Sequence, residues 1–289
     1  MSSPEPRKEL APVGLLPAAG RGLRFAAAGY IKELFPLLPR VSAAPVPAGP
    51  RPICERALRQ IRAAGAARCV VVLSPQKLMI AEVLAEGAHL DLALGYVLQA
   101  EPRGLPDAVR CAGPWLGERS VLLALPDTVV LPVDALARVE VERQRSGADV
   151  VLGLFPVATP ECLGPVEFDG DGRVLRVHDK PARSPVDNSW GVASWSPRFT
   201  DFCRRWEAAQ GQASSPPGER VLGHTFEAAR QAGLTLRAVW FPQGHFVDIG
   251  NPDGLRQALA LLATGGELDP AQAELARLLG PGRVSPSPG

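Results

Sequence analysis

The chain has 289 residues, a formal net charge of +1 and 46% hydrophobic residues. This length suits one large α/β domain or two small ones. The small net charge argues against nucleic acid or an anionic membrane as a partner. The hydrophobic and charged fractions are close to the average for a globular protein.

The five cysteines are widely spread, at positions 54, 69, 111, 162 and 203. Their odd number and spacing argue against a disulfide framework or a zinc site and favour a reducing compartment. The first residues lack the apolar stretch of a secretory signal, and no uncharged apolar run approaches the ~20 residues that span a bilayer. We therefore expect a soluble cytoplasmic protein with no membrane partner, and leave open whether it forms a homo-oligomer.

Short apolar runs bounded by Gly, Pro, Ser or charged residues recur through the first half of the chain. Such runs are typical of buried strands in a parallel sheet. They cover residues 12–17, 69–74, 92–99, 120–125 and 148–157.

Helical patterns lie between these runs, at residues 51–65, 78–87, 107–116 and 132–147. The first has Pro52 near its start and Gly65 past its end, which is typical of a helix. We expect Pro114 to break the third helix. The alternation of strand and helix predicts an α/β fold with a Rossmann-like, doubly wound, mostly parallel sheet and helices on both faces.

The pattern changes from about residue 158. Residues 164–181 hold an Asp-Gly-Asp-Gly turn between two β-rich runs, which predicts an inserted β-hairpin. Residues 234–241 predict a strand, and 252–266 and 269–280 predict helices. The proline-rich stretch 36–52 has neither pattern, so we expect a loop.

These patterns predict one domain over residues 12–264, flanked by a disordered start (1–11) and by a C-terminal helix with a frayed tail (265–289). The domain divides into a first half, 12–157, and a second half, 158–251. No internal repeat is visible.

A glycine-rich turn follows the first predicted strand in "LLPAAGRGLRF", and the backbone N–H groups of such a turn suit a phosphate. A dinucleotide fingerprint is disfavoured because Phe25 stands at the third glycine position and no acid ends the second strand. A P-loop is disfavoured because no Gly-Lys-Ser/Thr follows. Arg21, Arg24 and Lys32 add cations that favour a polyphosphate, while a plain tight turn remains the alternative for the glycines.

The stretch "PAAGRGLRF", followed by "KELFPL", resembles the signature of the nucleotide-sugar pyrophosphorylases, or sugar-1-phosphate nucleotidyltransferases, which include thymidylyl- and uridylyltransferases of glucose 1-phosphate. The resemblance implies that the loop and Arg24 grip a nucleoside triphosphate and that Lys32 contacts phosphate. It implies nucleotide-binding positions at Ala18, Ala19, Gly20, Gly22 and Arg24.

Other stretches match the same family in order, over residues 13 to about 258. In "LQAEPRGLPDAV" the resemblance implies that Gln99 reads a pyrimidine base, with Gly104 beside it. A glutamine amide has one donor group and one acceptor, which can pair with N3–H and O4 of uracil or thymine. The alternative for Gln99 is an ordinary polar residue at a strand end.

Two aspartates occupy positions that the resemblance assigns to Mg²⁺. Asp127 directly follows a predicted buried strand in "LLALPDTVV", and Asp248 follows a second apolar stretch in "HFVDIGNPDGL". Ligands of such sheets bind at the carboxyl ends of parallel strands, and two carboxylates plus substrate phosphates are a usual way to hold Mg²⁺. Taken singly, each aspartate would more often cap a helix or sit in a turn.

The second half of the chain carries the sugar side of the resemblance. In "LGPVEFDGDGRVLRVHDKP" a glycine would contact the sugar, and an acid and a lysine would bind its hydroxyl groups and phosphate. In "DNSWGVASW" a small residue would let the sugar approach. The implied sugar-binding residues are Gly164, Asp179, Lys180 and Gly191, and the two halves of the domain become nucleotide-binding and sugar-binding.

Several positions depart from the family pattern, and they leave the identity of the sugar and full activity open. An insert at 41–50 lengthens one loop, and Asp107 adds a carboxylate to the segment that follows Gln99. The remaining departures are Pro126, Thr128, Leu163 and Asp179.

The resemblance implies an Mg²⁺-dependent reaction in which a sugar 1-phosphate oxygen attacks the α-phosphorus of dTTP or UTP, giving an NDP-sugar and pyrophosphate. Its catalytic residues would be Arg24, Lys32, Asp127 and Lys180. Three alternatives remain open. They are a related transferase that uses CTP and phosphocholine, a nicotinamide oxidoreductase, and a non-catalytic binding or regulatory relative.

Overall fold

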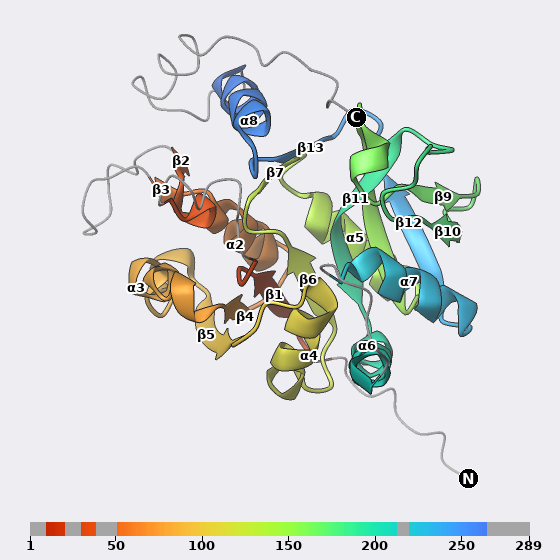
Figure 1. Cartoon of the computed structure of the whole chain (residues 1–289), viewed down its shortest axis with the longest axis horizontal. Coiled ribbons are helices and arrows are strands. Elements are labelled where there is room, and N and C mark those ends of the chain that lie inside the picture. The colour runs from red at the N-terminus through yellow and green to blue at the C-terminus, as the bar shows by residue number, and fades with distance from the viewer. Residues whose placement is uncertain (1–9, 21–29, 39–50, 213–219, 265–289) are drawn as a thin grey trace.

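A computed structural model of the chain describes residues 10–20, 30–38, 51–212 and 220–264 (Figure 1). Its centre is a seven-stranded sheet in the order β12-β8-β11-β6-β1-β4-β5. The pairs β1–β4, β1–β6, β4–β5 and β8–β12 are parallel, and only β11 runs antiparallel to its neighbours β6 and β8. The predicted mostly parallel, doubly wound sheet is therefore confirmed.

The elements follow one another as strand and helix along most of the described chain. The strands are β1 Val13–Pro17, β2 Pro36–Leu38, β3 Arg51–Pro52, β4 Arg68–Leu73, β5 Ala93–Leu98, β6 Val121–Ala124, β7 Thr128–Leu131, β8 Val150–Pro156, β9 Val166–Phe168, β10 Val174–Val177, β11 Asn188–Trp195, β12 Leu236–Trp240 and β13 His245–Asp248. The helices are α2 Cys54–Ala63, α3 Met79–Leu84, α4 Leu105–Leu116, α5 Ala135–Ser146, α6 Pro197–Gln212, α7 Leu222–Gln231 and α8 Pro252–Thr264.

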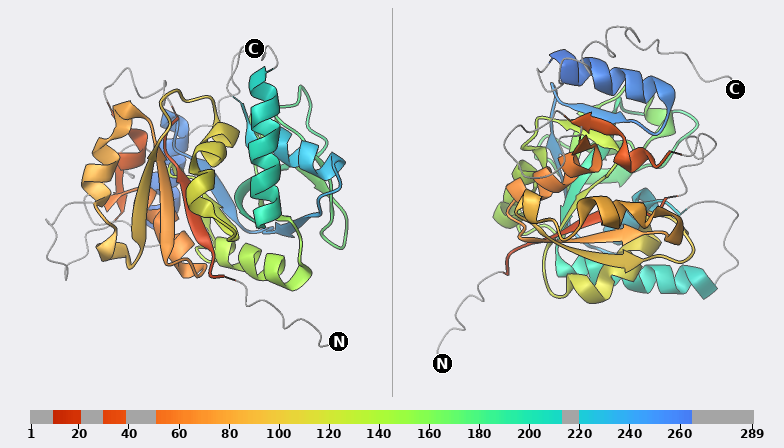
Figure 2. Two further views of the ribbon diagram at one scale, coloured as in Figure 1. Left: turned by 90° about the horizontal axis from the view of Figure 1, so that it is seen from below. Right: turned by 90° about the vertical axis from the view of Figure 1, so that its left-hand side faces the viewer.

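Helices cover both faces of the sheet, as predicted (Figures 1 and 2). Alternate residues of a strand point to opposite faces, so Leu15 of β1 joins one apolar cluster and Leu16 joins the other. The first cluster is completed by α4, α6 and α7, and the second by α2, α3 and α5. A third, smaller cluster holds α8 against β7 and β13, at one end of the molecule (Figure 1).

Three predictions for the first half of the chain are wrong in detail: the burial of the strand at 92–99, the break at Pro114 and the loop at 36–52. Strand β5 is not buried on both sides, because it is the edge strand and its residues are exposed or half-buried. Pro114 does not break α4, which continues to Leu116. This proline stands in the last turn, where its missing N–H removes a single helical hydrogen bond.

The proline-rich stretch 36–52 is not loop throughout. Its two ends pair as the short antiparallel strands β2 and β3, with Pro36 opposite Pro52 and Leu38 opposite Arg51. Residues 51–53 therefore precede α2 rather than open it. Residues 39–50, which include the whole predicted insert at 41–50, lie outside the described residues.

The second half contains the predicted hairpin, formed by β9 and β10, and the predicted strand β12. Two helices in this half, α6 and α7, were not predicted. Helix α7 begins with weak helix formers, including Gly223 and Thr225, and packs Leu222, Phe226 and Ala229 into the core. Such a helix depends more on tertiary packing than on intrinsic propensity. The helix predicted at 269–280 lies outside the described residues.

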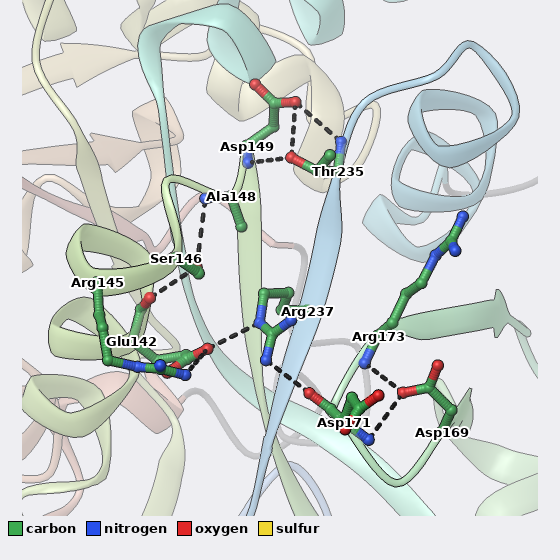
Figure 3. Close-up of polar contacts among 10 residues, drawn as sticks. All are labelled: Glu142, Arg145, Ser146, Ala148, Asp149, Asp169, Asp171, Arg173, Thr235 and Arg237. Atoms are coloured by element: carbon green, nitrogen blue, oxygen red, sulfur yellow. Dashed lines mark hydrogen bonds and ion pairs between the residues drawn. The ribbon is translucent and has the colours of Figure 1, made fainter.

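The hairpin turn is tied to the edge strand β12 by one arginine (Figure 3). Arg237 of β12 donates from Nε to Glu142 Oε1 of α5 at 2.7 Å and from Nη2 to the carbonyl of Asp171 at 2.6 Å. The backbone N–H of Ala238 also donates to the carbonyl of Gly172 at 2.7 Å. This contact covers part of an otherwise open sheet edge and fixes the hairpin whose far end carries Lys180.

We expect Arg237→Met to lower the free energy of unfolding by about 1.5–3 kcal/mol, because hydrogen bonds from a charged group are lost while the apolar stem remains. Urea denaturation would measure the change. Arg138→Met is the control, because the partner of the exposed Arg138 among the described residues is the half-buried Asp134, four residues away at the start of the same helix. Loss of such a surface pair costs about 0–1 kcal/mol, so equal losses in both variants would contradict the role given to Arg237.

Candidate active site

A cleft of about 1160 Å³ opens between the two halves of the domain. Its walls come from the segment after β6, the two ends of the hairpin region, and the starts of α7 and α8. The cleft therefore joins segments that lie far apart in the sequence. The predicted site residues in its lining are Asp127, Gly164, Asp179, Lys180 and Asp248.

The two predicted metal-binding aspartates lie next to each other. Asp248 ends β13 and pairs with Thr128, the residue after Asp127, and the N–H of Ile249 donates to the carbonyl of Asp127 at 3.0 Å. This antiparallel pairing of β7 with β13 places both carboxylates in the cleft, at the carboxyl edge of the sheet.

Lys32 reaches the same place from the turn that precedes β2, and its Nζ forms an ion pair with Asp127. Burial lowers the pKa of the Lys32 ammonium, but the carboxylates of Asp127 and Asp248 raise it, and the net pKa lies above the ordinary value. Lys32 is therefore charged at neutral pH and neutralises part of the negative charge of the aspartate pair.

The aspartate pair suits a hard divalent cation. Asp248 Oδ1 accepts the N–H of Gly250 at 2.6 Å, and Asp127 carries the second carboxylate of the pair. Among the described residues, no group of three or more His, Cys, Asp or Glu side chains is arranged to hold a metal ion. Two carboxylates without a complete cage fit Mg²⁺, which keeps several waters and takes phosphate oxygens as ligands.

Lys180 lies in the cleft, at the end of the hairpin region, in an unusual backbone conformation. Its φ is +40°, which is uncommon for a residue other than glycine. Its N–H donates to the carbonyl of Leu163 at 2.9 Å, so the hairpin closes on itself just before Gly164. Asp179 faces α7, where His224 Nε2 lies 3.6 Å from its Oδ2.

The structure gives the two predicted sugar-side glycines packing roles. A Cβ on Gly164 would lie 2.5 Å from Trp190 Nε1, and a Cβ on Gly191 would lie 2.5 Å from the ring of Phe246. Both aromatic rings line the cleft, whereas Gly191 does not. Gly191 also stands at a bulge in the pairing of β11 with β8, and bulges near active sites redirect side chains.

The nucleotide loop is described only at its beginning. Ala18 and Ala19 are buried, and the N–H of Ala18 donates to the carbonyl of Val72, so this amide belongs to the sheet. Among the described residues, no atom lies within 4 Å of where a Cβ on Gly20 would stand. Gly22 and Arg24 lie outside the described residues, as do Arg21 and Phe25.

Gln99 and Gly104 are both present at the carboxyl edge, directly after β5. Gln99 is 3% exposed and does not line the cleft. Its Nε2 donates to Asp107 Oδ2 at 2.5 Å and to the carbonyl of Gly104 at 3.4 Å. The donor half of the amide is thus engaged within the protein, so the predicted use of donor and acceptor together on one base does not fit this geometry.

Sequence reasoning missed several groups near the site. Arg220 lines the cleft, pairs with the buried Glu207 at 2.6 Å and lays its backbone against Gly104. Glu33, next to Lys32, forms a buried ion pair with Lys77 at 2.6 Å. Burial raises the pKa of Glu33 and Lys77 opposes that shift. Glu33 belongs to the quoted stretch "KELFPL", but the sequence does not show its partner or that of Arg220, because these pairs are brought together only by the fold.

The fold and the cleft are those of an α/β ligand-binding protein whose site lies at the carboxyl edge of its sheet. Residues 26–265 match the family model described as nucleotidyl transferase. The match covers most of the chain, and the protein therefore belongs to the nucleotidyl transferase family.

Curated relatives include glucose-1-phosphate thymidylyltransferases. The chain is 26% identical over 203 residues to the enzyme of Streptomyces antibioticus, covering 70% of this chain and 54% of that protein. It is 29% identical over 242 residues to the enzyme of an Actinoplanes species, covering 81% and 75%. A low-salt glycan biosynthesis nucleotidyltransferase of Haloferax volcanii is 24% identical over 221 residues, covering 75% and 59%. The chain thus spans little more than half the length of two of these relatives.

A solved structure of a Bacillus anthracis protein, assigned as a glucose-1-phosphate thymidylyltransferase, has the same fold. Its TM-score is 0.70 at 17% identity, covering 94% of this chain and 98% of that one.

The five cysteines of the present chain are free, as expected. Within the described residues, no helix has the length and apolar character needed to cross a membrane.

Proposed function

We propose that this protein joins a nucleoside triphosphate to a sugar 1-phosphate and releases pyrophosphate, with dTTP or UTP as the preferred nucleotide. The observation that carries the proposal is that Asp127 and Asp248 meet in the cleft that also holds Lys180, and that Lys32 forms an ion pair with Asp127. A reaction between two negatively charged substrates needs positively charged groups at one place, supplied by the protein segments that bind each substrate.

In this proposal the oxygen of the sugar phosphate attacks the α-phosphorus, and pyrophosphate leaves on the opposite side. Lys180, at the hairpin end, neutralises the incoming sugar phosphate. Lys32 serves the α-phosphate, to which it can move from its ion pair with Asp127. Arg24 and the amides of the loop after β1 hold the β- and γ-phosphates, whose charge grows as the leaving group departs.

Asp127 and Asp248 are the proposed ligands of Mg²⁺, which when bound would offset phosphate charge. The two aspartates also attract Lys32, which forms an ion pair with Asp127 at the cleft wall. On the sugar side, Trp190 and Phe246 supply apolar walls, and Asp179 supplies a carboxylate for a hydroxyl group. The preference for dTTP or UTP depends on Gln99, whose Oε1 is the hydrogen-bonding atom that its contacts within the protein leave for a base.

Pyrophosphate release from each of dTTP, UTP, CTP, ATP and GTP, in the presence of Mg²⁺ and a panel of sugar 1-phosphates, tests the proposal. We expect turnover with dTTP or UTP and at least one hexose 1-phosphate. Phosphocholine is the non-sugar control. Turnover only with CTP and phosphocholine, or nucleotide binding without any turnover, would overturn the proposed reaction in favour of one of the alternatives.

A further inference from the structure

Asp107 is a buried carboxylate that the proposed reaction does not use. It stands in the first turn of α4, is 3% exposed, and lies directly beside Gln99, the residue that follows β5. The N–H of Gln99 donates to the carbonyl of Leu73 at 2.8 Å, and Ala18 is joined in the same way to Val72. Gln99 therefore lies on the same sheet edge as the start of the nucleotide loop.

Both oxygens of Asp107 are engaged. Oδ2 accepts from Gln99 Nε2 at 2.5 Å, and Oδ1 accepts from Arg110 Nε at 2.8 Å. An ionised carboxylate accepts hydrogen bonds and cannot donate them. The amide nitrogen of Gln99 must therefore face Asp107, and its carbonyl oxygen must face the other way.

The direction of this amide matters for a pyrimidine base. A free glutamine can rotate its amide by half a turn, and so accept from a donor or donate to an acceptor with the same side chain. Uracil and thymine carry a hydrogen on N3, whereas N3 of cytosine is an acceptor. A glutamine fixed with Oε1 toward the base matches uracil or thymine and opposes the lone pair of cytosine.

We propose that Asp107 is a positioning residue that sets the base preference of the site by holding Gln99 in its acceptor orientation. The inference rests on the proposed function, because it takes Gln99 as the side chain that faces the base. Asp107 is itself held by its place in the first turn of α4, where a negative charge is stabilised. The substrate class that follows is a nucleotide whose base presents N3–H.

Equilibrium binding of UTP and CTP, with Mg²⁺ and without sugar phosphate, separates the two nucleotides without relying on turnover. We expect the wild-type protein to bind UTP at least about tenfold more tightly than CTP, which is the typical size of one mispaired base contact. Asp107→Asn keeps the shape but lets Gln99 turn, so the ratio should fall to within about threefold, mainly through tighter CTP binding.

Arg110→Ala is the matched control. It removes the partner of Oδ1 but leaves Oδ2 for Gln99, so the UTP to CTP ratio should stay near the wild-type value. Asp107→Ala, which also releases Gln99, is the second variant and should lower the ratio in the same way if Asp107→Asn does not fold. A melting curve of each variant shows that it is folded at the temperature of the titration.

Two results would overturn the inference while leaving the proposed transfer reaction intact, although the first would also remove the proposed nucleotide preference. The first is a wild-type protein that binds UTP and CTP equally, and the second is an unchanged ratio in a folded Asp107 variant. A wild-type protein that binds no nucleoside triphosphate would overturn both the inference and the proposed function.

Discussion

Replacing Gly104 with alanine is expected to lower the free energy of unfolding by about 2–6 kcal/mol. Gly104 has φ +109° and ψ −179°, a region open essentially to glycine alone, and enforcing it on alanine costs of order 1–3 kcal/mol. A Cβ there would also lie 2.0 Å from the carbonyl oxygen of Arg220, and such overpacking adds about 1–3 kcal/mol. The neighbouring atom is backbone, so it cannot turn away as a flexible side chain can.

Gly117 provides a matched control for this prediction. The two glycines flank the same helix, α4, and Gly117 has φ +60° and ψ −150°, so alanine at 117 carries a similar backbone strain. Nothing lies within 4 Å of a Cβ at Gly117. Urea denaturation of the two variants would give the cost of the contact with Arg220 as their difference. Equal losses would show that the close approach of Arg220 is not what requires a glycine at 104.

The fold could be predicted wherever its signal was local. Buried strands leave a short apolar run bounded by turn residues, so the run at residues 12–17 predicted β1, Val13–Pro17, to within one residue. Helix α7 left no such signal, because Gly223, His224 and Thr225 are poor helix formers and the helix depends on Phe226 and its neighbours in the core. The sequence of β5 likewise does not show that it is an edge strand, because an edge position depends on which strands pair.

The site residues also divide into those that the sequence could predict and those that it could not. Asp127 follows a buried strand, at the sheet edge where such proteins bind ligands, while Asp248 was placed beside it by the family resemblance. The structure brings the two together through the pairing of β7 with β13. The reasons for glycine at 164 and 191 could not be predicted, since Trp190 and Phe246 reach those positions only in the folded chain.

The contact between Gln99 and Asp107 shows why residue types alone could not predict how Gln99 would bind a base. A glutamine amide read from the sequence offers a donor and an acceptor. The orientation of α4 places the carboxylate of Asp107 against the amide nitrogen of Gln99, so the carbonyl oxygen of Gln99 is the acceptor that remains. The preference for uracil or thymine therefore stays a prediction, and the contact with Asp107 changes the geometry on which it was based.

Asp127→Asn and Asp248→Asn are each expected to reduce turnover by about 10²–10³-fold, which corresponds to the loss of one preorganised charged group in the site. An asparagine keeps the shape of aspartate but carries no charge, so it holds a divalent cation poorly. Asp127→Asn should be the more severe change, because it also removes the ion-pair partner of Lys32. The rate of pyrophosphate release, measured against Mg²⁺ concentration, gives the defect of each variant.

Asp91→Asn is the control for the chemical change itself, because Asp91 is 83% exposed and pairs only with Arg62 at the surface. It should keep the wild-type rate. The double variant Asp127→Asn/Asp248→Asn should lose less than the product of the two single defects, since side chains that hold one ion act as a unit. If either single variant keeps a near-wild-type rate at saturating Mg²⁺, that aspartate only shapes the turn between its strands. If the two defects simply multiply, each carboxylate acts alone and the shared cation site is wrong.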